Sequence, residues 1–153
     1  MEISWSWKRF EEISGVEMHE LLSLRQAVFI VEQQCIYQDI DEWDSQAWHL
    51  SGRDQTGKLI AYARITFPNT KSENPTLGRI LVDSKNRRLG LGRETVKQCI
   101  QKCVLEYPDK PIRISAQTYL LTFYEAFGFE SVGQPYDDEG VKHIDMVPIQ
   151  THS

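Results

Sequence analysis

Three strand-like segments follow one another between two helical segments of this chain, and no other feature restricts the fold as strongly. Residues 48–53, 59–67 and 77–82 are rich in apolar, β-branched and aromatic residues and are separated by turn-forming residues. A doubly wound domain would place a helix between each pair of neighbouring strands. The order therefore predicts a domain of the α/β or α+β class with a mixed sheet.

The other segments complete an order of strand, helix, three strands, helix, strand, helix and two strands. The first helix opens at Ser14, because Ser14 and Glu17 have the spacing of a capping box, and it ends at Glu32. The remaining segments are strands at 5–8, 112–116, 129–132 and 143–149 and helices at 92–105 and 120–127. No linker, repeat or low-complexity tract interrupts them, so we expect one domain over residues 1–153.

Charge is distributed unevenly along the chain. Residues 1–50 carry a net charge of −7, residues 51–133 a net charge of +5 and residues 134–153 a net charge of −3, which gives −5 in all. A basic middle between acidic ends suggests an anionic ligand in the middle and a cationic one elsewhere. Nucleic acid is not the expected partner of a chain whose isoelectric point is near 5.4.

Composition also bears on the compartment and on metal chemistry. No stretch approaches about 18 uncharged apolar residues, and the first residues lack the order of a secretory signal, so we expect a cytoplasmic protein that does not bind membranes. Cys35, Cys99 and Cys103 cannot all pair, and we interpret them as small apolar residues of a reduced core. Without nearby histidines they do not complete a metal site. A monomer and a homodimer are both compatible with the sequence.

A glycine-containing turn between a predicted strand and a predicted helix carries the strongest chemical signal. Two glycines let the chain turn with its amide groups pointing inward, and the start of the helix adds a partial positive charge. Neighbouring arginines supply fixed charge and forked donors, so the turn predicts a cradle for a phosphate or pyrophosphate group. It lacks the lysine of a nucleoside-triphosphate loop and the third glycine of a dinucleotide fingerprint, so we expect neither ATP nor NAD. The cradle consists of Arg87, Arg88, Leu89, Gly90, Leu91, Gly92 and Arg93.

Two motifs together resemble the GNAT acetyltransferase superfamily. The motifs are Leu81-Val82 followed by Arg87-x-x-Gly90-x-Gly92 and, further along the chain, Phe123-Tyr124-x-x-x-Gly128-Phe129. In that family the first motif holds the pyrophosphate of acetyl-CoA, and the tyrosine before the Gly-Phe pair is often the general acid. The resemblance covers nearly the whole chain and implies a mixed central sheet of about seven strands with flanking helices. It also implies acetyl-CoA as the co-substrate and no metal.

Further segments are similar to the ElaA-type branch of this superfamily. They are Arg25-x-x-Val28-Phe29-x-Val31-Glu32-Gln33, Tyr37-Gln38-Asp39-Ile40-Asp41, Trp48-His49-Leu50, Ala61-Tyr62-Ala63-Arg64-Ile65, Gly78-Arg79, Ala116-Gln117 and Gly140-x-x-His143-Ile144. Ser84 and Arg88 stand where many relatives have proline and glycine, and neither difference removes an amide from the cradle. Gln117 stands where many relatives have asparagine, and we expect it to hydrogen-bond the pantetheine arm of the cofactor.

Acyl transfer requires that a long, flexible cofactor be held along its length. The strand edge at Ile80, Leu81 and Val82 is suited to pair with the pantetheine arm as an added strand would, and the Val82 N–H to steady the developing oxyanion. An attacking amine must be neutral, so a base has to remove its proton. The departing thiolate, from a thiol with a pKa of about 8.5, is helped by a proton from Tyr124, which therefore also contacts the cofactor.

Each candidate side chain also has a structural interpretation. Glu32 and His49 are candidate bases, but Glu32 is equally typical of a solvated carboxylate and His49 of a core histidine. Tyr124 and His143 have the same two interpretations, a functional one and a structural one. Three aromatic residues either line an acceptor pocket or belong to the core, namely Tyr37, Trp43 and Trp48.

Three functions are compatible with these residues. The first is an acetyl-CoA-dependent N-acetyltransferase that acts on an amine of a small molecule, peptide or protein. The acceptor is expected to be cationic if the acidic segment 39–44 attracts it, while the alternative is that this segment is a solvated loop. The other functions are a non-catalytic acyl-CoA-binding regulatory module and a partner-binding domain without a ligand. A domain without a ligand does not explain why nine lysines and arginines lie in the stretch from Arg79 to Arg113, because like charges close together repel unless an anion binds them.

Overall fold

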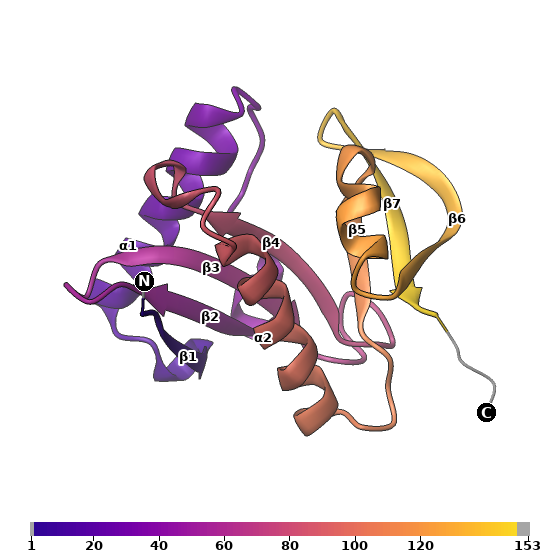
Figure 1. Ribbon diagram of the computed structural model, residues 1–153, viewed down its shortest axis with the longest axis horizontal. Helices are drawn as coiled ribbons and strands as arrows, with labels where there is room; N and C mark the ends of the chain where they lie inside the picture. Colours follow the sequence, from indigo (N-terminus) through magenta and orange to yellow (C-terminus); the bar gives the residue numbers. More distant parts are fainter. Residues whose placement is uncertain (1, 150–153) are drawn as a thin grey trace.

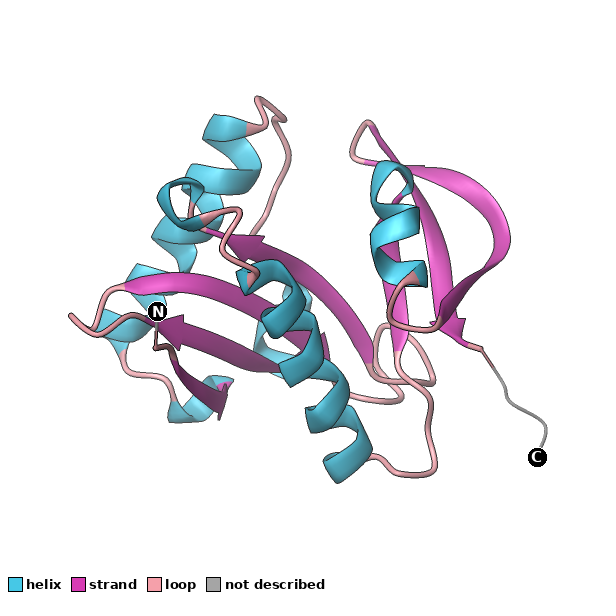
Figure 2. Cartoon of the chain, in the orientation of Figure 1, coloured by secondary structure: helices cyan, strands magenta, loops and turns pink. Residues whose placement is uncertain are grey.

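A seven-stranded sheet forms the centre of the computed structural model, which describes residues 2–149 (Figure 1). The strands lie in the order β1 (Ser4–Arg9), β2 (Ala47–Arg53), β3 (Leu59–Thr66), β4 (Thr76–Val82), β5 (Arg113–Gln117), β7 (Val141–Pro148) and β6 (Phe129–Asp138). β4 and β5 pair in parallel, and the other neighbours pair antiparallel. The prediction of a mixed sheet with flanking helices is therefore confirmed (Figure 2).

The helices agree with the sequence prediction in order but not in every detail. They are α1 (Gly15–Arg25), α2 (Leu91–Glu106) and α3 (Leu121–Glu125). The side chain of Ser14 accepts a hydrogen bond from the Glu17 N–H at 3.2 Å and so caps the helix at the predicted start, while the Glu17 carboxylate binds Lys8 instead of completing the capping box. Beyond α1 the backbone changes to a π-helix over Gln26–Glu32. Short 3₁₀ turns cover Phe10–Glu12, Glu42–Gln46, Ser84–Asn86 and Thr118–Leu120, so the predicted acidic loop is partly helical.

Two apolar cores hold the helices against opposite faces of the sheet. Cys99 and Cys103 of α2 lie in the first core, as predicted, together with Ala63 of β3. The same prediction is wrong for Cys35, which is only partly buried and belongs to neither core. Burial raises the pKa of the Cys103 thiol to about 12 and that of Cys99 well above its ordinary value. The second core joins α1 and the π-helix to β3 and β4 through Leu21, Val28, Phe29, Leu59, Tyr62 and Leu81. Because Tyr62 and Ala63 are neighbours in a strand, they point to opposite faces.

The sheet opens in the middle, where β4 and β5 part. Their pairing is limited to Thr76 with Arg113 and Leu77 with Ile114, and beyond these pairs the strands diverge (Figure 1). The β5 side of the later part of β4 therefore presents backbone groups that no strand of the sheet occupies. In the same part of β4 the register against β3 shifts, and Arg79 adopts a φ of +52°, which is strained for a residue with a side chain. The gap and the bulge position the candidate active site.

Candidate active site

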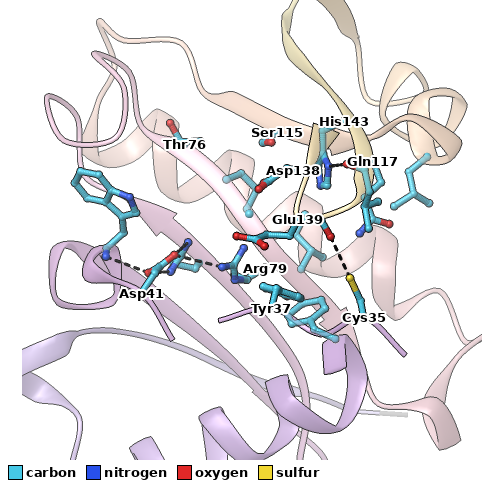
Figure 3. A pocket seen from close by; sticks show the side chains of 18 of the residues that line it. Cys35, Tyr37, Asp41, Thr76, Arg79, Ser115, Gln117, Asp138, Glu139 and His143 are labelled. Atoms are coloured by element: carbon cyan, nitrogen blue, oxygen red, sulfur yellow. Dashed lines mark hydrogen bonds and ion pairs between the residues drawn. The ribbon is translucent and has the colours of Figure 1, made fainter. Parts of the chain in front are cut away.

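A cleft of about 280 Å³ lies where β4 and β5 diverge. β4 contributes Arg79 and Ile80 to its wall, β5 contributes Gln117, and α3 contributes Tyr124. The β6–β7 hairpin closes the cleft from the other side. There the Sγ of Cys35 lies 3.3 Å from the backbone carbonyl oxygen of Glu139 in the hairpin (Figure 3). The cleft is therefore assembled from parts of the chain that are far apart in the sequence.

The predicted cradle forms the start of α2. Arg88 and Gly90 both have left-handed backbones, with φ of +67° and +76°. The first hydrogen bond within the helix runs from the Glu94 N–H to the Gly90 carbonyl oxygen at 3.1 Å, so the N–H groups before Glu94 have no acceptor inside the helix. Left-handed residues at a helix start turn successive amides toward one side, which is the geometry of an anion site. That these seven residues bind the phosphates of a cofactor stays a prediction.

Glu32 lies beside the cradle and not in the cleft. Its carboxylate accepts hydrogen bonds from both terminal nitrogens of Arg87, at 2.8 Å between Nη2 and Oε1 and more closely between Nη1 and Oε2. The hydrogen bond from Arg87 lowers the pKa of Glu32, and the carboxylate stays ionised. Arg87 also donates through Nε to the Val82 carbonyl oxygen at 3.1 Å. The side chain is bound to Arg87 and does not line the cleft, so this geometry does not favour Glu32 as the base that meets the acceptor, and that role stays a prediction.

His49 is a core residue. The Tyr62 hydroxyl lies 2.6 Å from its Nδ1, and the backbone carbonyl oxygen of Asp44 lies 2.8 Å from its Nε2. A carbonyl oxygen only accepts, so Nε2 carries the proton and Nδ1 accepts from the tyrosine. Burial lowers the pKa of His49 and favours this neutral ring. Both nitrogens are engaged and the ring does not line the cleft, so this geometry favours the structural interpretation of His49, and its catalytic role stays a prediction.

The acidic segment 39–44 is not a solvated loop, and its Asp39, Asp41 and Asp44 are not free to attract a cationic ligand because they pair with arginines of this chain. Arg25 lies 2.8 Å from an oxygen of Asp39 and 2.7 Å from an oxygen of Asp44, and Arg64 lies 3.0 Å from the same Asp44 oxygen. Although burial opposes ionisation, the bonds and charges of these arginines hold the pKa of Asp44 below its ordinary value. We name this set the arginine–aspartate network, and its members are Arg25, Arg64, Arg79, Asp39, Asp41 and Asp44.

The cleft meets this network at Arg79 and Asp41. Nε of Arg79 lies 2.9 Å from an oxygen of Asp39, but its N–H is not aligned with that oxygen, so the contact is electrostatic without being a hydrogen bond. Asp41 accepts bonds from Arg64 at 2.7 Å and from Arg79 at 3.3 Å. Three arginines thus face three aspartates, and the network brings no net charge to the cleft.

Tyr124 reaches the cleft from α3 and is otherwise buried. Burial raises the pKa of its hydroxyl, with smaller contributions from Cys99 and Tyr119. Within residues 2–149 the hydroxyl has no hydrogen-bond partner, so it is a protonated donor whose place in the wall leaves it available to a ligand. Its role as general acid stays a prediction. Tyr37 and Trp43 also line the cleft, whereas Trp48 packs edge-on against Phe67 away from it.

The three residues of β4 that were predicted to hold the pantetheine arm differ in their relation to the cleft. Ile80 lines the cleft next to the bulge at Arg79. Leu81 points into the core under α1, and Val82 pairs with Ala61 of β3. Neither Leu81 nor Val82 is part of the cleft wall, so the oxyanion position predicted at Val82 lies beyond it.

Sequence reasoning missed the contribution of the β6–β7 hairpin. Its tip, residues 138–140, turns through left-handed backbones at Glu139 and Gly140, with φ of +52° and +81°, and carries Asp138 and Glu139 to the cleft (Figure 3). His143 follows on β7 and also lines the cleft, with its Nδ1 2.8 Å from the backbone oxygen of Val141. Gly140 indicates a turn in the sequence, but it does not show that this turn carries the carboxylates of Asp138 and Glu139 to the cleft. No cluster of His, Cys, Asp and Glu within the described residues has the arrangement of a metal site, and none of the described helices has the length and apolarity of a membrane span.

Comparisons with known proteins agree with this geometry. The model of the acetyltransferase (GNAT) domain matches residues 12–149. The chain is 54% identical to the UPF0039 protein sll0451 of Synechocystis over 96% of both chains, and 37% identical to the protein ElaA of Escherichia coli over 94% of this chain and 95% of that one. Among solved structures, an acyl-CoA N-acyltransferase from Pseudomonas aeruginosa superposes with a TM-score of 0.91 at 31% identity, covering 97% of this chain and 100% of that one. The crystal structure of Escherichia coli ElaA gives a TM-score of 0.88 at 36% identity, with the same coverage.

Proposed function

The chain belongs to the GNAT acetyltransferase family and is similar throughout to ElaA and UPF0039 proteins, and on this premise we propose that it is an acetyl-CoA-dependent N-acetyltransferase. One observation carries the proposal. The left-handed cradle before α2 is joined to the end of β4 by the hydrogen bond from Arg87 to the Val82 carbonyl oxygen, and the gap that opens between β4 and β5 has a buried tyrosine in its wall. A long ligand with a charged end and an amide-bearing arm fits this arrangement.

The cradle is proposed to bind the cofactor phosphates chiefly through backbone amides. The Leu91 side chain is buried, so this residue offers only its N–H, while the Leu89 side chain is exposed and adds no polar group. Arg87, Arg88 and Arg93 are exposed and surround the same turn with fixed positive charge. A phosphate would take the position that the Glu32 carboxylate holds beside Arg87.

The pantetheine arm is proposed to lie in the gap along β4, with Gln117 of β5 as a further hydrogen-bonding partner. Ile80 is the better candidate than Val82 for the N–H that meets the thioester oxygen, because Ile80 lines the cleft and stands next to the bulge. A bulge frees backbone groups from the strand ladder, and a freed N–H is available to an oxyanion. Leu81 contributes packing under α1 rather than a contact in the cleft.

Tyr124 is proposed to support the departing sulfur. Its raised pKa keeps the hydroxyl protonated at neutral pH, so it serves as a hydrogen-bond donor to the forming thiolate. Complete transfer of its proton is uphill, since an ordinary thiol has a pKa of about 8.5. The transfer therefore has to be coupled to the return of a proton from the acetylated nitrogen.

The acceptor is proposed to be a cationic amine of a small molecule, peptide or protein. The arginine–aspartate network is balanced, so the support for this comes from the hairpin tip. Asp138 and Glu139 line the cleft and form no ion pair within residues 2–149. Unpaired carboxylates at the mouth of a cleft attract and orient an ammonium group.

A thiol-release assay tests this function. Acetyl-CoA is mixed with the protein and a panel of polyamines, amino acids, aminoglycosides and peptides, and free CoA is measured. We expect turnover with cationic amines, and the preference for them should weaken at high salt because exposed charges are screened. Binding of acetyl-CoA without thiol release for any amine would indicate a regulatory module instead. No thermal shift with acetyl-CoA would indicate a domain without this ligand.

Replacing Tyr124 by Phe tests the role of the hydroxyl. The substitution keeps the ring and its packing, so the fold and the affinity for acetyl-CoA should survive. Turnover should fall by at least about tenfold, since positioned proton transfer is typically worth 10²- to 10⁴-fold in rate. Tyr119→Phe is the matched control, because that hydroxyl belongs to an exposed tyrosine of the same wall. Unchanged turnover in Tyr124→Phe would mean that water, and not Tyr124, donates the proton to the departing thiolate.

A further inference from the structure

His143 stands in the wall of the cleft with one ring nitrogen engaged and the other free. Its Nδ1 lies 2.8 Å from the backbone carbonyl oxygen of Val141, which only accepts hydrogen bonds. In the neutral ring the proton is therefore on Nδ1, and Nε2 carries the lone pair. Within residues 2–149 no group bonds to Nε2. The free nitrogen is thus in the form that accepts a proton.

The ring is also held in place. It stacks on Tyr136 of β6, with ring centroids 6.1 Å apart and an angle of 23° between the planes. Tyr136 in turn bonds to Asp145 and Ser115, both at 2.6 Å. A side chain whose orientation is fixed by packing and by a hydrogen bond needs little rearrangement to meet a substrate.

We propose that His143 is the general base that removes the proton from the acceptor amine, an inference that rests on the proposed acetyltransferase function. Met146 of β7 lies in the core shared with α2 and Tyr124, and Ile144 is also buried. Side chains alternate along a strand, so His143 and Asp145 point to the opposite face of the sheet. Tyr124 reaches the gap from the helical side. A thioester in the gap therefore has the base on one side and the acid on the other, as direct attack requires.

The proton balance assigns a role to each of the two groups. Nε2 of His143 takes one proton from the ammonium and later releases it to solvent. The neutral amine then forms the C–N bond while the carbonyl electron pair moves to oxygen. As the C–S bond breaks, the electron pair stays on sulfur, which takes the proton of Tyr124. A second proton from the nitrogen restores the tyrosine, and the products are the amide and the free thiol.

Several charged and titratable groups face the cleft around His143. Those in the cleft wall are Asp138 and Glu139 at the hairpin tip, Lys71 from the loop before β4, Tyr119 after β5, Tyr124 of α3, and Cys35, Tyr37, Asp41, Arg64 and Arg79 on the far side. Tyr136 of β6 stacks on the ring, and Asp145 of β7 bonds to Tyr136 behind it. Asp145 is bound to Arg113 at 2.8 Å. The two tip carboxylates attract the ammonium toward His143, and Lys71 opposes them. Asp138 and Glu139 are the alternative bases, and the test has to separate them from His143.

The test compares wild type with His143→Asn across pH. The asparagine amide retains a donor for the Val141 carbonyl but has no basic nitrogen. We expect kcat at pH 7 to fall by about 10²-fold or more and the acidic limb of the kcat profile to disappear, with the calorimetric affinity for acetyl-CoA unchanged. His143→Ala should recover part of its turnover when free imidazole is added. The control is His19→Gln, which alters an exposed histidine of α1 and should leave the profile intact.

The outcomes distinguish this proposal from the function it rests on. If wild type turns over and His143→Asn keeps both its rate and its acidic limb, His143 is not the base. Loss of the limb in Asp138→Asn or Glu139→Gln instead would assign the base to that carboxylate. If His143→Asn unfolds, imidazole rescue of His143→Ala and a substitution of His143 by Gln decide the question. If wild type binds acetyl-CoA but transfers to no amine, the proposed function and this inference both fail.

Discussion

Two arginine-rich regions flank the same gap in the sheet and use their charges in opposite ways. In the arginine–aspartate network, the side chains of Arg25 and Arg64 are 0% and 2% exposed and face three aspartates. At the cradle, Arg87 is 39% exposed and has one carboxylate partner, Glu32, which is itself exposed. The buried arginines of the network are neutralised by aspartates and serve to stabilise the fold, whereas the exposed arginines of the cradle leave positive charge available to bind a ligand. The sign of a charge in the sequence therefore does not show whether it acts in folding or in binding.

The largest expected effect is on the buried region. Arg25→Met removes one of the two arginine partners of both Asp39 and Asp44 and leaves two buried carboxylates under-compensated. Breaking a buried pair in this way typically costs about 3–5 kcal/mol, so urea unfolding should show a loss of that size or an unfolded chain. Arg53→Met is the matched control, since its pair with Glu20 is partly exposed, and its loss should stay within about 1 kcal/mol. Equal losses in the two variants would contradict the contrast between the regions.

Acid should weaken the same network selectively. Arginine bonds lower the folded-state pKa values of Asp41 and Asp44 against the opposing effect of burial. Because these pKa values are depressed, the stability they contribute is complete above the unfolded value near 3.8 and is lost as pH falls through the folded values. Wild-type unfolding free energy should therefore decline below about pH 4. A milder variant, Asp41→Asn, should show a shallower decline, and an unchanged slope would contradict this assignment.

At the cradle the informative loss is in affinity for acetyl-CoA. Gly90→Val places a β-branched residue at a φ of +76°, where the backbone costs about 1–2 kcal/mol and the amides are displaced. Gly57→Val gives the same strain at a φ of +87° in the β2–β3 turn, and both glycines have open space around them. Calorimetry should show acetyl-CoA binding weakened by about tenfold or more in the Gly90 variant, with no change in the Gly57 variant. Arg87→Ala should also weaken binding while leaving the unfolding free energy nearly unchanged.

The difference between the regions also explains what the sequence predicted well. The cap at Ser14, the glycine turn that starts α2 and the short helix that carries Tyr124 depend on residues that are close in the chain, and local geometry follows from local sequence. The fold class followed from the order of segments for the same reason. The long β6 was missed because its register shifts between Val132 and Tyr136, and a turn-rich sequence does not reveal that a strand continues through it.

The acceptor side was not predictable in this way, since its contacts join distant segments. His49 and His143 both lie on strands beside acidic residues, yet the sheet buries one and carries the other to the cleft. Which of two faces a strand residue takes depends on register, and register is set by partners elsewhere in the chain. Asp39 and Asp44 likewise find Arg25 14 and 19 residues away, at distances that only the folded chain creates.

The smallest expected effect concerns the contact between the cradle and Glu32. In the free protein Glu32 binds Arg87, so a cofactor phosphate has to compete with this carboxylate for the same guanidinium. An exposed pair of this kind is worth about 0.2–1 kcal/mol, which limits the gain on its removal to about fivefold. Glu32→Gln should therefore tighten acetyl-CoA binding by up to about fivefold at low salt, and the gain should shrink toward 0.5 M salt because exposed charges are screened. Glu20→Gln, which loses the comparable pair with Arg53, should leave the affinity unchanged. Weaker binding in Glu32→Gln would mean that the carboxylate positions Arg87 for the phosphate instead of competing with it, and the cradle would then resemble the buried network in needing an internal acid to hold its arginine.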